Sequence, residues 1–151
     1  FDWDEINFAE CSREMLESGN FWDVQLYYKP FWEKPPLFIW VEACSMKLFG
    51  VTEFAARFPN ALCGGLTLGL MAFWSLHFYT KQFCATWIIT LLGCMLPLLY
   101  FKSGIIDPWF NLYILVALFF AIVKPDRLKY LIASGLILGL AVLTKGPVAF
   151  L

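Results

Sequence analysis

The stretch FCATWIITLLGCMLPLLYF, residues 83–101, contains no charged side chain. About 20 consecutive apolar residues are enough for a helix to cross the ~30 Å hydrocarbon core of a membrane. Three further apolar stretches flank it, at residues 59–79, 103–123 and from about residue 130 to the end. The sequence therefore predicts an all-α polytopic transmembrane protein with about four spanning helices, the last of them truncated.

The overall composition agrees with a membrane protein. Apolar residues make up 60% of the 151 and charged residues 15%, and the mean hydropathy is +0.67. Soluble domains are typically about 45–50% apolar and about 25% charged. The net charge of -1 gives no reason to expect a nucleic-acid partner. The five cysteines form no Cys-x-x-Cys pair and no cluster with histidine, so we interpret them as packing residues and expect neither disulfides nor a metal site.

The first 58 residues are too polar to cross a membrane. Residues 4–18 are predicted to form a helix that Asp4 caps and Gly19 ends. A second short helix is expected to begin at Pro35-Pro36 and to end before Gly50. We expect both helices to lie along the membrane interface, where the aromatic side chains of residues 20–36 would also be favourable. Residues 1–58 are thus interpreted as an external loop, and residues 59–151 as the transmembrane part.

Counting the connections assigns the loops to two sides of the membrane. Residues 80–82 and 124–129 fall on one side, and residues 1–57, 102–108 and Lys145 fall on the other. The 124–129 loop carries three cationic side chains against one acid. The positive-inside rule makes that side cytoplasmic, so the acidic N-terminal region is expected outside.

This topology gathers several charged side chains at the outer surface: Asp4, Glu5, Glu33, Lys34, Asp107 and Lys145. Capping of a helix N-terminus could by itself explain Asp4 and Asp107, and a lysine can extend its ammonium to the interface without binding a ligand. Lys34 lies between Glu33 and two prolines and is surrounded by aromatics, where its point charge would suit a phosphate. An enzyme acting on lipid-linked substrates, a transporter vestibule and a non-catalytic scaffold all remain compatible with this pattern.

Three motifs narrow the choice: DEINFAECSREM at residues 4–15, KPFWEKPP at 29–36 and LFGVTEFAAR at 48–57. Together they resemble the first external loop of the GT-C membrane glycosyltransferases that use polyprenyl-phosphate sugars. That family includes the lipid A aminoarabinose transferases and the protein O-mannosyltransferases. Asp107-Pro108 and Thr144-Lys145-Gly146 resemble later landmarks of the family in the same order.

The resemblance implies an inverting transfer of a hexose or pentose from a polyprenyl phosphate to an acceptor hydroxyl on lipid A, a protein or another glycan. Asp4 matches the family's catalytic aspartate, and Asp107 a second acidic residue near the site. Lys34 matches the lysine that holds the donor phosphate, and we group Glu33, Glu5 and Lys145 with it as substrate-binding residues. The alternative is a transporter or flippase for an anionic lipid-linked substrate.

The resemblance also leads to expectations about the whole protein. No cofactor and no metal are expected, and the bacterial inner membrane is the expected location, with the site on its periplasmic face. Phe8 and Phe31 stand where the family often has tyrosine, so hydrogen bonds from those hydroxyls are missing. We interpret the chain as a fragment that lacks a preceding helix and the later parts, and we expect it to be inactive alone.

Overall fold

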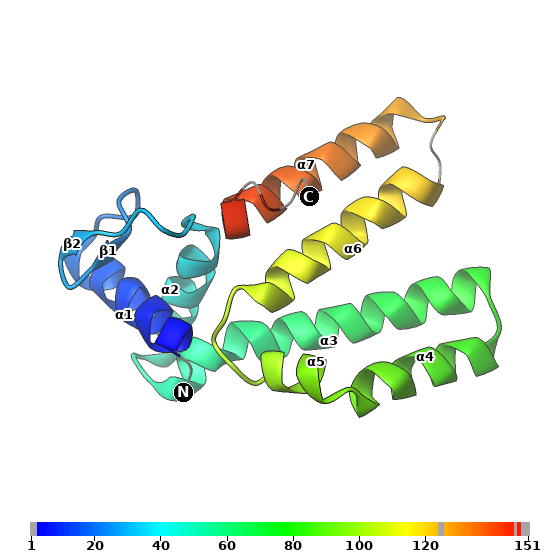
Figure 1. Ribbon diagram of the computed structural model, residues 1–151, viewed down its shortest axis with the longest axis horizontal. Coiled ribbons are helices and arrows are strands. Elements are labelled where there is room, and N and C mark those ends of the chain that lie inside the picture. Colours follow the sequence, from blue (N-terminus) through cyan, green and yellow to red (C-terminus); the bar gives the residue numbers. More distant parts are fainter. Residues whose placement is uncertain (1–2, 124–125, 147, 149–151) are drawn as a thin grey trace.

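The computed structural model describes residues 3–123, 126–146 and 148 of the chain. Figure 1 shows an N-terminal lobe from which long helical rods extend in one direction. The N-terminal lobe, residues 3–52, holds α1 (Trp3–Ser18), β1 (Gln25–Leu26), β2 (Lys29–Pro30) and α2 (Leu37–Phe49). The rods are α3 (Glu53–Phe78), α4 (Lys81–Gly93) with α5 (Met95–Tyr100), α6 (Asp107–Val123) and α7 (Leu128–Lys145).

Helix α1 packs one apolar face into the lobe. Phe8, Cys11 and Met15 are all buried, and Gly19 follows the helix with a φ of +69° that favours glycine. The prediction for Asp4 is wrong in one respect. Asp4 lies inside the first turn of α1 rather than at its cap, because the helix already includes Trp3.

The rest of the lobe is built on a tight hairpin and α2. Tyr27 and Tyr28 join β1 to β2 with φ values of 56° and 57°, the backbone of a two-residue turn that matches strand twist. The Tyr28 amide donates to the buried Glu14 carboxylate at 2.8 Å, which helps to hold this otherwise unfavourable backbone. As predicted, α2 begins directly after Pro36 and ends before Gly50.

Helix α3 runs without a break from Glu53 to Phe78. Thr52 caps it, accepting a hydrogen bond from the Ala55 amide at 3.2 Å. Pro59 lies inside the helix and has no N–H to offer the Ala55 carbonyl. The Ser45 hydroxyl donates to that carbonyl at 2.6 Å instead, which ties α2 to α3. The expected division of the chain between residues 58 and 59 thus falls within one continuous helix.

The prediction of a single helix over residues 83–101 is wrong. Helix α4 ends at Gly93, Cys94 is extended with φ −78° and ψ 121°, and α5 begins at Met95. The break has a local cause in Pro97, which cannot donate to the Gly93 carbonyl and whose ring would clash with it. Gly93 adds to the effect because glycine weakens a helix.

The rods form two antiparallel pairs, α3 with α4 and α6 with α7 (Figure 1). The end of α3 and the end of α6 lie at one extremity, and the α5–α6 connection and the end of α7 return to the lobe at the other. The connections are therefore divided between the two ends of the molecule as the sequence predicted. Lys124 of the positively charged loop lies outside the described residues. Among the described residues, α3 and α7 are long and apolar enough to cross a membrane, and α6 is a shorter apolar helix.

Small residues bring α6 and α7 together. Ala117 and Ala141 are both buried, and the Ser134 hydroxyl of α7 donates to the Ala117 carbonyl of α6 at 2.8 Å. Small side chains allow helices to approach closely in membranes, and an interhelical hydrogen bond adds to the contact. The close pairing places the end of α7 beside the start of α6, where Lys145 and Asp107 lie.

Candidate functional site

Asp4 and Lys34 lie together on the surface of the lobe. The Lys34 ammonium is 3.8 Å from an Asp4 carboxylate oxygen and 6.0 Å from the centre of the Phe8 ring, one turn further along α1. Pro35 and Pro36 fix the backbone just after Lys34, since proline permits little variation in φ. At 3.8 Å the pair attract each other without a hydrogen bond, and 52% of the Asp4 side chain is exposed. Both groups can therefore reach a ligand.

Asp107 and Lys145 form the second pair. The Lys145 ammonium hydrogen-bonds directly to the Asp107 carboxylate, and it also lies 5.6 Å from the Phe110 ring centre. Asp107 occupies the first turn of α6 and Lys145 the last turn of α7. Each charge thus complements the dipole of its own helix. Because α6 and α7 are antiparallel, these two helix ends meet.

One apolar cluster joins the two pairs. Phe8 and Phe38 are edge-to-face with ring centres 5.7 Å apart, and Ile106 and Trp109 pack against them. Phe8 is the ring beneath Lys34, whereas Ile106 immediately precedes Asp107. The cluster therefore connects the face that carries Asp4 and Lys34 to the start of α6 that carries Asp107.

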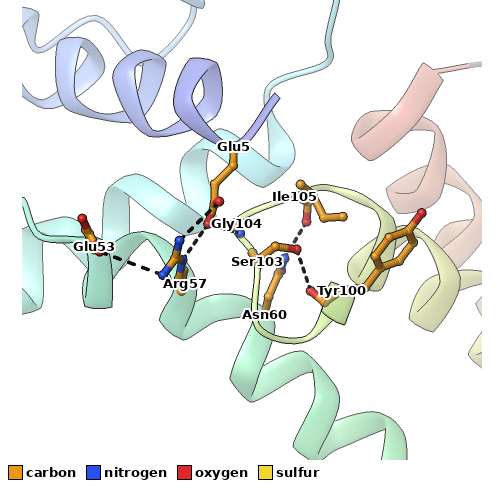
Figure 2. Close-up of polar contacts among 8 residues, drawn as sticks. All are labelled: Glu5, Glu53, Arg57, Asn60, Tyr100, Ser103, Gly104 and Ile105. Carbon is orange, nitrogen blue, oxygen red and sulfur yellow. Dashed lines mark hydrogen bonds and ion pairs between the residues drawn. The ribbon is translucent and has the colours of Figure 1, made fainter. Parts of the chain in front are cut away.

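Glu5 is not brought to the same face. Only 3% of it is exposed, and its carboxylate accepts from Arg57 Nε at 2.7 Å and from the Gly104 amide at 2.9 Å (Figure 2). Burial works against ionisation of Glu5, but the hydrogen bonds from Arg57 and Gly104 outweigh it and lower the pKa of this carboxyl below its usual value. Glu33, in contrast, is exposed and makes no hydrogen bond or ion pair with the residues that the structure describes.

Reasoning from the sequence missed the importance of Arg57 and Asn60. Arg57 lies 3.9 Å from Glu53, one turn back on α3, but its shorter bond is to Glu5. The Asn60 amide, one turn along α3, donates to the carbonyls of Ser103 and Ile105 at 2.6 and 2.7 Å. The two motifs that contain Glu5 and Arg57 were the available signal, since both belong to the same resemblance.

A second buried acid, Glu42, lies close to this network. It is fully buried, accepts a hydrogen bond from Ser12 at 2.9 Å through one oxygen, and leaves the other oxygen without a partner in the described part of the chain. Burial raises the pKa of Glu42 to about 8. Burial therefore favours the protonated form of this carboxyl.

The described residues contain no group of three or more His, Cys, Asp or Glu side chains arranged to hold a metal ion. Metal independence stays a prediction. The arrangement that the structure does show is an ammonium beside an accessible carboxylate, with a second such pair at the end of the same apolar cluster. An ammonium can neutralise a phosphate and a carboxylate can accept a proton.

Comparisons with known proteins identify relatives of this chain. The family described as dolichyl-phosphate-mannose-protein mannosyltransferase matches residues 33–151. An undecaprenyl phosphate-alpha-4-amino-4-deoxy-L-arabinose arabinosyl transferase 2 from Pseudomonas fluorescens is 31% identical over 98% of the chain. The corresponding protein of Sodalis glossinidius is 32% identical over 97% of it. The chain spans only 28% of the length of each of these relatives.

Two solved structures have the same fold. ArnT from Cupriavidus metallidurans in the apo state is 28% identical and superposes on 98% of this chain with a TM-score of 0.88. The same protein bound to undecaprenyl phosphate is 26% identical over 99% of the chain, with a TM-score of 0.78. In both cases the match covers 29% of the solved chain. The likeness confirms the predicted fold class, an all-α polytopic transmembrane protein.

Proposed function

Since the chain belongs to the dolichyl-phosphate-mannose-protein mannosyltransferase family, we propose that it forms part of an inverting membrane glycosyltransferase. The whole enzyme moves a hexose or pentose from a polyprenyl-phosphate carrier to an acceptor hydroxyl. The names of the arabinosyl transferases that resemble it support undecaprenyl phosphate as the carrier. The acceptor is lipid A, a protein or another glycan.

The observation that carries this proposal is the placement of Lys34 between the Asp4 carboxylate and the Phe8 ring. The donor is a phosphodiester that joins the polyprenyl chain to the sugar. The bond between the sugar and the phosphate oxygen breaks as the polyprenyl phosphate leaves. A lysine that neutralises the departing phosphate lowers the barrier to this step. We assign that role to Lys34.

Asp4 supplies the second requirement of the reaction. Inverting transfer needs a base that orients the acceptor hydroxyl and takes its proton as the new glycosidic bond forms. Asp4 is more than half exposed beside Lys34, so an acceptor can approach its carboxylate. Asp107 is assigned as a second acid near the site, and Lys145 and Glu33 as donor-binding residues.

The proposed location is the bacterial inner membrane, with the site at its periplasmic face. Both lysine–carboxylate pairs lie at the lobe end of the molecule, and the cationic Arg127 and Lys129 lie near the opposite end, at the start of α7. The positive-inside rule favours the cytoplasm for that opposite end. The proposed active site then faces outward, where the final acceptors of surface glycans are found.

Sugar transfer by the full-length protein tests the proposal. Wild type is compared with Asp4→Asn and Lys34→Ala, using undecaprenyl phosphate loaded with a labelled sugar. Loss of a catalytic base or of the phosphate's countercharge should reduce transfer about 100-fold or more. Asp23→Asn and Lys47→Ala change exposed charges of the same lobe and should transfer normally. Movement of the lipid without sugar transfer would instead identify a transporter.

A further inference from the structure

Asp4 and Glu5 are neighbours on α1, but their side chains point in different directions. Successive residues of a helix are rotated by about 100°. Asp4 therefore meets Lys34 on the lobe surface, whereas Glu5 points into the junction between α1, α3 and the loop before α6 (Figure 2). The carboxylate of Glu5 is inaccessible to a substrate of the assigned site, because the side chain is only 4% exposed.

Glu5 joins segments that are far apart in the chain. One oxygen, Oε1, accepts from Arg57 Nε, 52 residues away, and from the Gly104 amide, 99 residues away. The other oxygen, Oε2, lies 3.5 Å from Arg57 Nη2. Hydrogen bonds between charged groups are stronger than those between neutral ones. A single buried carboxylate thus connects α1, α3 and the loop that leads into α6.

The same loop is also held from α3. Asn60 donates to the Ser103 carbonyl at 2.6 Å and to the Ile105 carbonyl at 2.7 Å, on either side of Gly104 (Figure 2). Asp107 follows Ile105 by two residues. The loop that delivers Asp107 to the site is therefore anchored to the helix that carries Asp4 through Glu5, and to the first rod through Asn60.

We propose that Glu5 is a positioning residue, which, with Arg57 and the Gly104 amide, fixes Asp4 of α1 relative to Asp107 of α6. This inference rests on the proposed function, in which those two acids belong to one site. It replaces the role of substrate-binding residue that was predicted for Glu5 from the sequence. It also gives the motifs at residues 4–15 and 48–57 a common role: the first supplies the buried acid and the second its guanidinium partner.

Gly104 is part of the arrangement because a side chain at this position would crowd Glu5 and its neighbours. A Cβ at this position would lie 3.3 Å from Glu5 Cγ, 3.4 Å from the Ala56 carbonyl oxygen and 3.5 Å from a Glu42 carboxyl oxygen. Gly104→Ala would therefore press on Glu5 without removing any charge. Gly69 offers a matched control, since a Cβ there would meet nothing within 4 Å.

The test uses the full-length protein with Glu5→Gln, Gly104→Ala and the control Gly69→Ala. Steady-state sugar transfer gives kcat and the KM for the donor. Hydrogen exchange of residues 102–106 reports on the loop without depending on activity. Glu5→Gln keeps the shape of the side chain but loses the charge that pairs with Arg57, so the mutant should still fold.

We expect kcat to fall about 10- to 100-fold in Glu5→Gln and Gly104→Ala, because small displacements of reacting groups have effects of this size. The KM should stay within about twofold, exchange in residues 102–106 should accelerate, and Gly69→Ala should behave as wild type. A raised KM with unchanged kcat in Glu5→Gln would show direct substrate contact and overturn the proposal. Unchanged kcat and exchange in both site variants would overturn it as well.

The two proposals fail in distinguishable ways. If the wild-type protein transfers no sugar, the proposed function falls, but exchange in residues 102–106 still tests the connection that Glu5 makes. Faster exchange in both site variants would support that connection, and unchanged exchange would refute it. Loss of activity together with unchanged exchange would place Glu5 in the chemistry itself rather than in positioning.

Discussion

The two lysines at the lobe end of the molecule are held by their carboxylates in different ways. Lys145 is hydrogen-bonded directly to Asp107, whereas Lys34 stands 3.8 Å from Asp4. A directly bonded ammonium has to give up its partner before it binds a phosphate fully. Lys34 does not, which is the physical reason for assigning the donor phosphate to it.

The Asp107–Lys145 pair should contribute to stability as well as to the site. Lys145→Met leaves Asp107 without its partner, and we expect a loss of about 1 kcal/mol in the free energy of unfolding, since the pair is partly exposed. Thermal unfolding in detergent measures this loss. The double variant Asp107→Asn/Lys145→Met should recover part of the loss, and Lys81→Met, at an exposed position, should be neutral. A fully stable Lys145→Met protein would contradict the expectation.

Glu42 should make stability depend on pH. Its pKa is raised from 4.5 to about 8, so between these values the folded protein binds a proton that the unfolded chain releases. The contribution of Glu42 to stability is then fully present below about pH 4.5 and is lost as pH rises toward 8. Glu42→Gln removes this dependence. Its unfolding temperature should exceed that of wild type by a few degrees more at pH 8 than at pH 5.5.

Asp126→Asn, which alters an exposed acid, is the control for Glu42→Gln. If wild type and Glu42→Gln lose stability in parallel between pH 5.5 and pH 8, Glu42 is already ionised in the folded protein and its assignment here is wrong.

At the residue scale, the sequence identified the charged residues of the site more successfully than the residues to which each of them is bonded. The resemblance placed Asp4 and Lys34 in one site, and the structure holds them side by side. Glu5 was grouped with them as a substrate-binding residue, but its side chain points into the junction with Arg57 and Gly104. The direction in which a helical side chain points depends on its angular position and on what packs against the helix, and Arg57 and Gly104 are too distant in sequence to be recognised as partners.

At the scale of helices, contact between neighbouring rods depends on glycine. A Cβ on Gly64 of α3 would lie 2.8 Å from Cγ of Phe101, which follows α5. Adjacent Gly65 has nothing within 4 Å. The two glycines therefore have the same local sequence context but different surroundings.

Gly64→Ala should destabilise the protein by about 1 to 3 kcal/mol, the usual effect of adding a methyl group to a packed site, whereas Gly65→Ala should be neutral or slightly stabilising. Thermal unfolding of both variants under the same conditions measures the difference. Equal unfolding temperatures for the two variants would mean that Phe101 moves aside freely, and that it does not pack against Gly64 as described.

The apolar pattern predicted the helices of this chain more reliably than their ends. The ends of α1 and α2 followed from Gly19 and Gly50, whose positive φ values stop a helix. The break between α4 and α5 was missed because apolar content alone does not reveal it. Pro97 acts four residues back, on the Gly93 carbonyl, so the helix ends well before the proline itself.

For the whole molecule, the arrangement of rods predicts which ends face the same side of the membrane. Single cysteines at Ser18 and Asp126, both exposed, would be introduced into the full-length protein after the native cysteines are replaced. An impermeant maleimide added to intact cells should label position 18 directly and position 126 only after permeabilisation. Labelling of both positions from outside would contradict the proposed topology.

The general architecture could be predicted because hydrocarbon imposes a simple length requirement on helices. Counting connections then grouped the helix ends correctly. The packing of the lobe against the start of α6 could not be derived in this way, because it depends on contacts such as that of Phe8 with Ile106, which join segments far apart in the chain.

Binding of undecaprenyl phosphate to the full-length protein tests the central claim, that Lys34 receives the carrier phosphate, most directly. Lys34→Ala should raise the Kd about 10-fold or more, the usual effect of losing a hydrogen bond to a charged group. Lys47→Ala, an exposed lysine at the end of α2, should bind as wild type does. A Kd for Lys34→Ala equal to that of wild type would contradict the claim.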